Sequence, residues 1–215
     1  MDSMQPASSA VELANYLRRR LERLEYCNAD LERRVSEDEA EFCRKVDEGV
    51  YKRDDPELGR VVFHLEYVLA NTFRTCMLSA VCSFLEEALK SMGSLLVPQY
   101  DAELKKREGR WLKKNLLALR DMAGVDCQSV QASVDRFDDL IVLRNCVVHS
   151  GGSVAGDRKP EDVRAAVKRI DSPDIAEISR DDFLIFGDQL VPEAITVAED
   201  IAECILTSKL GASVA

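Results

Sequence analysis

Three side chains that could act together on a phosphate group lie within six consecutive residues of this 215-residue sequence. Arg144 is a permanent cation, Asn145 carries an amide, and His149 carries an imidazole that can exchange a proton near neutral pH. Acid–base chemistry at a phosphate requires such a mixture of groups. The three residues stand in the segment 143–152 (LRNCVVHSGG), which ends a strongly apolar stretch. This segment is therefore the candidate site.

Two other interpretations of the segment remain open. Arg144 could form an ion pair with Glu86 or Asp138, while the neighbouring amide and imidazole cap the end of a helix. Cys146 and His149 could instead form a thiol–imidazole pair. A spacing of three residues on one helix is, however, a poor geometry for activating a thiol without a third group.

Helical geometry limits what one copy of the segment can do. Asn145 and His149 are four residues apart and share one face of a helix. Arg144 and His149 are five residues apart, which places them about 140° apart around the helix axis. They cannot both point straight at one small group, so two copies that meet at a two-fold axis would form a better site.

A long helix is expected from about residue 11 to 46, because apolar residues recur there at heptad spacing. The predicted seam is formed by Ala14, Leu17, Leu21, Leu24, Asn28, Leu31 and Val35. Asn28 is the kind of polar seam residue that fixes the register of paired helices. The helix is either an arm over residues 11–55, packed on the body or on a second copy, or the ordinary first helix of a bundle. Residues 1–10 are expected to be disordered.

The rest of the chain also has the pattern of a helical bundle. Helices are expected at about 56–92, 110–122, 128–148, 161–170 and 192–206. Gly93 should end the first of these, and a polar connection should cover residues 99–108. Residues 175–186 could hold two short extended pieces around Arg180 and Asp181. We therefore predict an all-α, antiparallel up-and-down bundle over residues 56–208, with a long N-terminal helix.

The charge of the chain narrows the classes of partner. A formal net charge of −10 and a pI near 4.9 argue against a general nucleic-acid coat or a membrane-surface binder. Residues 101–124 are locally basic, with seven bases against four acids. This segment is either a solvated helix face, which we favour, or a phosphate-binding patch. The seven bases are Lys105, Lys106, Arg107, Arg110, Lys113, Lys114 and Arg120.

Neither a cofactor nor a metal centre is indicated by the sequence. The seven cysteines form no CxxC pair, and His64 has no second histidine or cysteine at ligand spacing. We interpret His64 as a packed or surface residue. The cysteine usage, with no apparent signal peptide or membrane-spanning stretch, predicts a protein of the reducing cytoplasm.

The sequence from Arg144 to His149 resembles the R-x4-6-H motif of HEPN domains (higher eukaryotes and prokaryotes nucleotide-binding). Arg144 matches the family arginine, Asn145 the polar position after it, and His149 the family histidine. The resemblance covers roughly residues 56–208, and only the motif is specific.

This resemblance implies a helical bundle that forms a homodimer and cuts RNA without a metal, in the setting of defence or of a toxin–antitoxin pair. His149 would then be a general base or acid, Arg144 would hold the scissile phosphate, and Asn145 would orient one of these groups. The products would be a 2′,3′-cyclic phosphate and a 5′-hydroxyl. The alternative is a non-catalytic module of the same fold that dimerises or binds a nucleotide or a protein.

Overall fold

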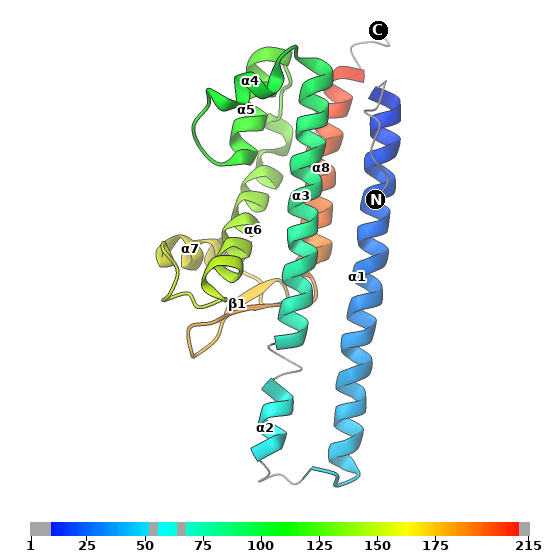
Figure 1. The fold of residues 1–215 in the computed structure, drawn as a ribbon, viewed down its shortest axis with the longest axis vertical. Helices are drawn as coiled ribbons and strands as arrows, with labels where there is room; N and C mark the ends of the chain where they lie inside the picture. Colours follow the sequence, from blue (N-terminus) through cyan, green and yellow to red (C-terminus); the bar gives the residue numbers. More distant parts are fainter. Residues whose placement is uncertain (1–9, 52–55, 64–67, 211–215) are drawn as a thin grey trace. The chain divides into compact units, whose positions relative to one another are not determined.

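The chain is predominantly helical in a computed structural model, which describes residues 10–51, 56–63 and 68–210. The helices, in chain order, are α1 (Ala10–Asp47), α2 (Pro56–Phe63), α3 (Ala70–Leu96), α4 (Tyr100–Lys105), α5 (Trp111–Ala123), the short 3-10 helix η2 (Gln128–Val130), α6 (Gln131–Ser150), α7 (Pro160–Ile170) and α8 (Leu190–Leu210). Strands β1 (Ala176–Ile178) and β2 (Leu184–Phe186) form a small antiparallel pair (Figure 1). The predicted all-α bundle with one short extended pair is confirmed.

The described residues divide into two compact units. One unit contains residues 10–23, 80–138 and 194–210, and the other contains residues 24–51, 56–63, 68–79 and 139–193. The segment 143–152 belongs entirely to the second unit. Among the described residues, no helix is long and apolar enough to cross a membrane.

Helix α1 has the length that its heptad pattern predicts. Its seam residues Leu17, Leu21, Asn28 and Val35 are buried within a single copy of the chain. In the second unit, Arg74 of α3 holds Glu32 of α1 through two hydrogen bonds of 2.8 and 2.7 Å. The seam is therefore covered by the same chain.

Helix α3 is longer than predicted at its C-terminal end. Glycine usually weakens a helix, so Gly93 was expected to end it, yet α3 continues to Leu96. The ring of Tyr100 takes the space where a side chain at position 93 would lie, since a Cβ there would be 2.1 Å from its Cε1. The prediction was wrong because glycine is needed at position 93 for packing against Tyr100, and not for ending the helix.

Within the predicted helix over 56–92, the structure describes α2 and then α3. The intervening residues 64–67, and with them His64, lie outside the described residues. The connection expected over 99–108 contains the short helix α4, whose Tyr100 is buried and donates a 2.9 Å hydrogen bond to the Asn115 side chain. Helix α5 ends at Gly124 in the left-handed conformation, as the sequence predicts.

Candidate functional site

Helix α6 carries the segment on its last two turns. The helix ends at Ser150 because Gly151 and Gly152 take positive φ angles of 61° and 84°. The Gly152 amide then donates to the Cys146 carbonyl at 3.4 Å. Among the described residues, neither the Asn145 nor the His149 side chain forms a hydrogen bond with a carbonyl at this end of the helix. The two side chains therefore do not cap α6.

Arg144 is half-buried and is held by two neutral groups. Its Nε donates to the Ser79 Oγ on α3 at 3.2 Å, and its Nη1 donates to the Asn145 Oδ1 at 3.0 Å. No carboxylate pairs with it in the described part of the chain, so its charge is not neutralised there.

The two carboxylates that could have paired with Arg144 have other partners. Glu86 forms an ion pair with Lys90 one turn along α3, at 2.8 Å. Asp138 forms ion pairs with Arg110 at 3.0 Å and with Lys113 at 3.2 Å. The ion-pair interpretation of Arg144 is therefore not borne out.

His149 lies apart from Arg144. Its side chain is exposed and has neither a hydrogen bond nor an ion pair with the residues described. Arg144 is directed to α3 through Ser79, and five helical positions separate the two residues. The structure thus brings Arg144 and Asn145 together and leaves the imidazole open to a group from outside the chain.

Cys146 is not available as a nucleophile. Its side chain is fully buried, and burial raises the pKa of its thiol to about 11. A thiol with this pKa is protonated at neutral pH, and the thiolate is the reactive form. The cysteine–histidine interpretation therefore has no support in the geometry.

A pocket of about 840 Å³ opens beside the end of α6, and the sequence did not indicate it. It is lined by Val68, Asn71, Thr72, Thr75 and Cys76 near the start of α3, by Val147 and Gly151 of the candidate segment, and by residues 177–181 and 183–185 of the β1–β2 hairpin. The only signal was the extended pair predicted around Arg180 and Asp181.

The hairpin is fixed to the end of α6 and to α3. The Leu184 amide donates to the Gly152 carbonyl at 2.9 Å, and the Val154 amide donates to the Asp182 carbonyl at 2.9 Å. Asn71 of α3 donates to the Leu184 carbonyl and accepts from the Phe186 amide. These bonds hold the hairpin beside the segment that follows His149.

The basic segment over 101–124 is largely neutralised. Five of its seven bases take part in ion pairs, involving Glu103, Asp121 and Asp138. This favours the solvated helix face over a phosphate-binding patch. In the same described ranges, no group of three or more histidine, cysteine or acidic side chains could hold a metal ion.

Comparison of the chain with protein-family models, with curated proteins and with solved structures finds no match. The case for a function therefore depends on the site itself.

Proposed function

We propose that two copies of this chain form a metal-independent endoribonuclease of the HEPN type, in which Arg144 of one copy works with His149 of the other. One observation carries the proposal: the half-buried Arg144 has two neutral hydrogen-bond partners and no carboxylate among the described residues. A cation held in place in this way can receive a phosphate without first giving up an ion pair.

In the proposed reaction, the 2′-hydroxyl oxygen attacks the adjacent phosphorus. A new P–O2′ bond forms and the P–O5′ bond breaks, which leaves a 2′,3′-cyclic phosphate and a 5′-hydroxyl. An imidazole takes the proton of the 2′-hydroxyl or returns a proton to the leaving 5′-oxygen. Arg144 binds the non-bridging oxygens, whose negative charge grows in the transition state, and Asn145 orients its guanidinium.

The dimer is part of the proposal because Arg144 and His149 of one chain point in different directions. A two-fold axis near the end of α6 would bring the arginine of one copy towards the histidine of its partner and generate two equivalent composite sites. We also place the protein in the cytoplasm, where a chain whose seven cysteines are all free would remain reduced.

The test is incubation of the purified protein with total RNA in excess chelator. Wild type and Arg158→Ala should cleave, whereas Arg144→Ala and His149→Ala should lose at least about a hundredfold in rate. Arg158 is the control because it is exposed and has no ion pair among the described residues. New 5′-ends should accept phosphate from polynucleotide kinase without phosphatase treatment. Equal cleavage by all four proteins, or by none, would refute the proposal.

The pocket favours a second candidate, which is a non-catalytic nucleotide-binding module of the same fold. Its volume lies in the range of small-molecule sites, about 300–1,000 Å³. In that case RNA would bind without being cut, and His149→Ala would leave the affinity unchanged. The buried seam of α1 gives no such support to pairing through the N-terminal helix.

A further inference from the structure

The pocket beside α6 lies on the Arg144 side of that helix. Arg144 and Val147 are three residues apart on α6 and share one face, and Gly151 follows directly after the end of that helix. The facing part of α3 shows the same relation, because Ser79, which bonds Arg144, shares a face with the pocket-lining residues Cys76, Thr75 and Thr72. The Arg144–Ser79 contact therefore lies about one helical turn from the pocket lining, on the same faces of α6 and α3.

The wall formed by α3 and the residues just before it is partly exposed. Val68, Thr72 and Cys76 of this wall are exposed, so the chain leaves a valine, a threonine methyl group and a thiol facing the pocket. Phe183 of the hairpin also lines the pocket and is 49% exposed. A solvent-facing aromatic ring in the lining of a pocket can hold a flat, unpaired base by stacking.

The hairpin adds three charged side chains to the lining. Glu177, Arg180 and Asp181 have neither an ion pair nor a side-chain hydrogen bond within the described ranges. Glu177 stands opposite Ile185 in the strand pair. Two carboxylates against one guanidinium disfavour a phosphate inside the pocket and favour a group that donates hydrogen bonds.

We propose that this pocket binds an unpaired, amino-bearing base of an RNA strand, guanine in preference to the others, with the adjoining phosphate on Arg144. The inference rests on the proposed function and names its substrate class. Guanine offers N1–H and N2–H side by side, which matches the two oxygens of a carboxylate such as Glu177. Uracil offers one N–H between two carbonyl oxygens, which a carboxylate repels, so it should bind weakest.

The test measures binding of labelled heptamers U3XU3, with X as G, A, C or U, in chelator and in a His149→Ala background that prevents cleavage. The heptamer with X as G should bind about tenfold tighter than the heptamer with X as U, and Glu177→Gln should remove most of that preference. Phe183→Leu should weaken all the heptamers, by about tenfold for G. Glu161→Gln and Tyr26→Leu are matched controls, because Glu161 is exposed and Tyr26 is 76% exposed, and neither residue lines the pocket.

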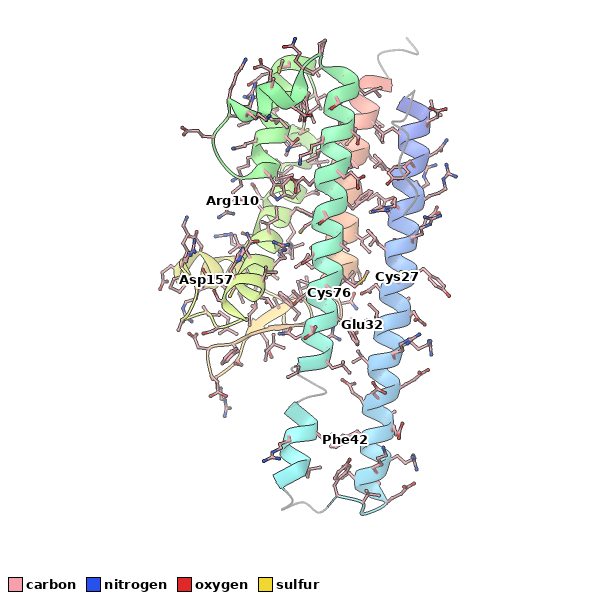
Figure 2. All side chains as sticks on the ribbon, viewed as in Figure 1. Cys27, Glu32, Phe42, Cys76, Arg110 and Asp157 are labelled. Carbon is pink, nitrogen blue, oxygen red and sulfur yellow. The ribbon has the colours of Figure 1, made fainter. Side chains whose placement is uncertain are left out.

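A second measurement needs no substitution in the pocket. Cys76 is exposed in the pocket wall, whereas Cys27 is exposed on α1; both are labelled in Figure 2. Cys43 is also exposed on α1. Saturating U3GU3 should slow alkylation of Cys76 at least fivefold and leave Cys27 and Cys43 unchanged, as followed by mass spectrometry. If Cys76 is alkylated at the same rate with and without bound heptamer, the pocket assignment is overturned.

The outcomes separate this inference from the proposed function. Cleavage that depends on Arg144 and His149, but with no effect of the pocket variants on binding, overturns the pocket and leaves the nuclease. Binding that depends on Glu177 and Phe183, without cleavage by the wild type, supports the pocket and overturns the nuclease. Neither binding nor cleavage overturns both.

Discussion

The Nε of Arg144 on α6 donates a hydrogen bond to the Oγ of Ser79 on α3, across 3.2 Å and a sequence separation of 65 residues. This bond, together with the 3.0 Å bond to Asn145, fixes a guanidinium that has no carboxylate partner among the described residues. Ser79 is therefore expected to position Arg144 and not to touch the substrate.

We predict that Ser79→Ala lowers the rate of RNA cleavage about tenfold, because a guanidinium with one fewer anchor is held less well in the productive geometry. Ser79→Thr keeps a hydroxyl and should restore most of the rate. Thermal unfolding separates this effect from a loss of fold, and Ser83→Ala, an exposed serine of the same helix, is the control. A Thr variant as slow as the Ala variant would contradict the positioning role.

Cys146 should respond to pH as a buried thiol. Burial raises the pKa of its thiol from 9.0 to about 11, so the folded chain keeps the proton over a range in which the unfolded chain releases it. Its contribution to stability is then fully present below pH 9 and is lost as the pH rises towards 11. Urea unfolding between pH 8 and 10.5 should show a smaller decline of the unfolding free energy for Cys146→Ala than for wild type. Identical slopes would show that the thiol titrates normally in the folded chain.

The ion pair between Glu32 and Arg74 should be a main attachment of α1 in the second unit. Both side chains are largely buried, at 14% exposed for Arg74 and 24% for Glu32, and Arg74 also donates to the Phe186 carbonyl at 2.7 Å. We expect Glu32→Ala to lower the free energy of unfolding by about 2 kcal/mol, because the Nε–H and Nη2–H donors of Arg74 lose their acceptors. Glu37→Ala, which removes an exposed ion pair with Arg33, should have no measurable effect in the same denaturant titration.

Gly93 should be intolerant of even one added methyl group. Gly93→Ala places a Cβ 2.1 Å from the Tyr100 ring, so we predict a loss of about 2 kcal/mol in unfolding free energy despite the higher helix propensity of alanine. Gly59→Ala in α2 meets nothing within 4 Å and should be neutral or stabilising. In the double variant Gly93→Ala with Tyr100→Ala, the two costs should be less than additive. Additive costs would mean that the two residues do not compete for space.

The elements of the fold were predictable where one local pattern decides them. The heptad spacing predicted α1 to within one residue at each end, and the ends predicted at residues 122 and 148 lie within two residues of the ends of α5 and α6. The prediction failed where packing, and not a local pattern, decides the residue type or the element. Gly93 lies inside α3 and leaves the space that the Tyr100 ring occupies, and α4 forms in a polar sequence that has a single buried residue, Tyr100.

The candidate site was predictable only in part. The residue types and spacing gave Arg144, Asn145 and His149 as candidates, and the structure shows a hydrogen bond between Arg144 and Asn145 but, within its described ranges, none to His149. The sequence could not give Ser79 as a partner, because nothing local connects two residues 65 positions apart. For the same reason the pocket was missed, since its walls come from α3, α6 and the β1–β2 hairpin.

The composite site is the central claim, and complementation between two inactive variants tests it most directly. Arg144→Ala and His149→Ala protein are unfolded together, refolded as an equimolar mixture and assayed on RNA in chelator. Half of the dimers should then pair the two variants, and each such dimer should hold one complete site of two. We predict about a quarter of the wild-type rate from the mixture and background from either variant alone. A mixture that stays at background, with mixed dimers shown by affinity-tag capture, would contradict the claim.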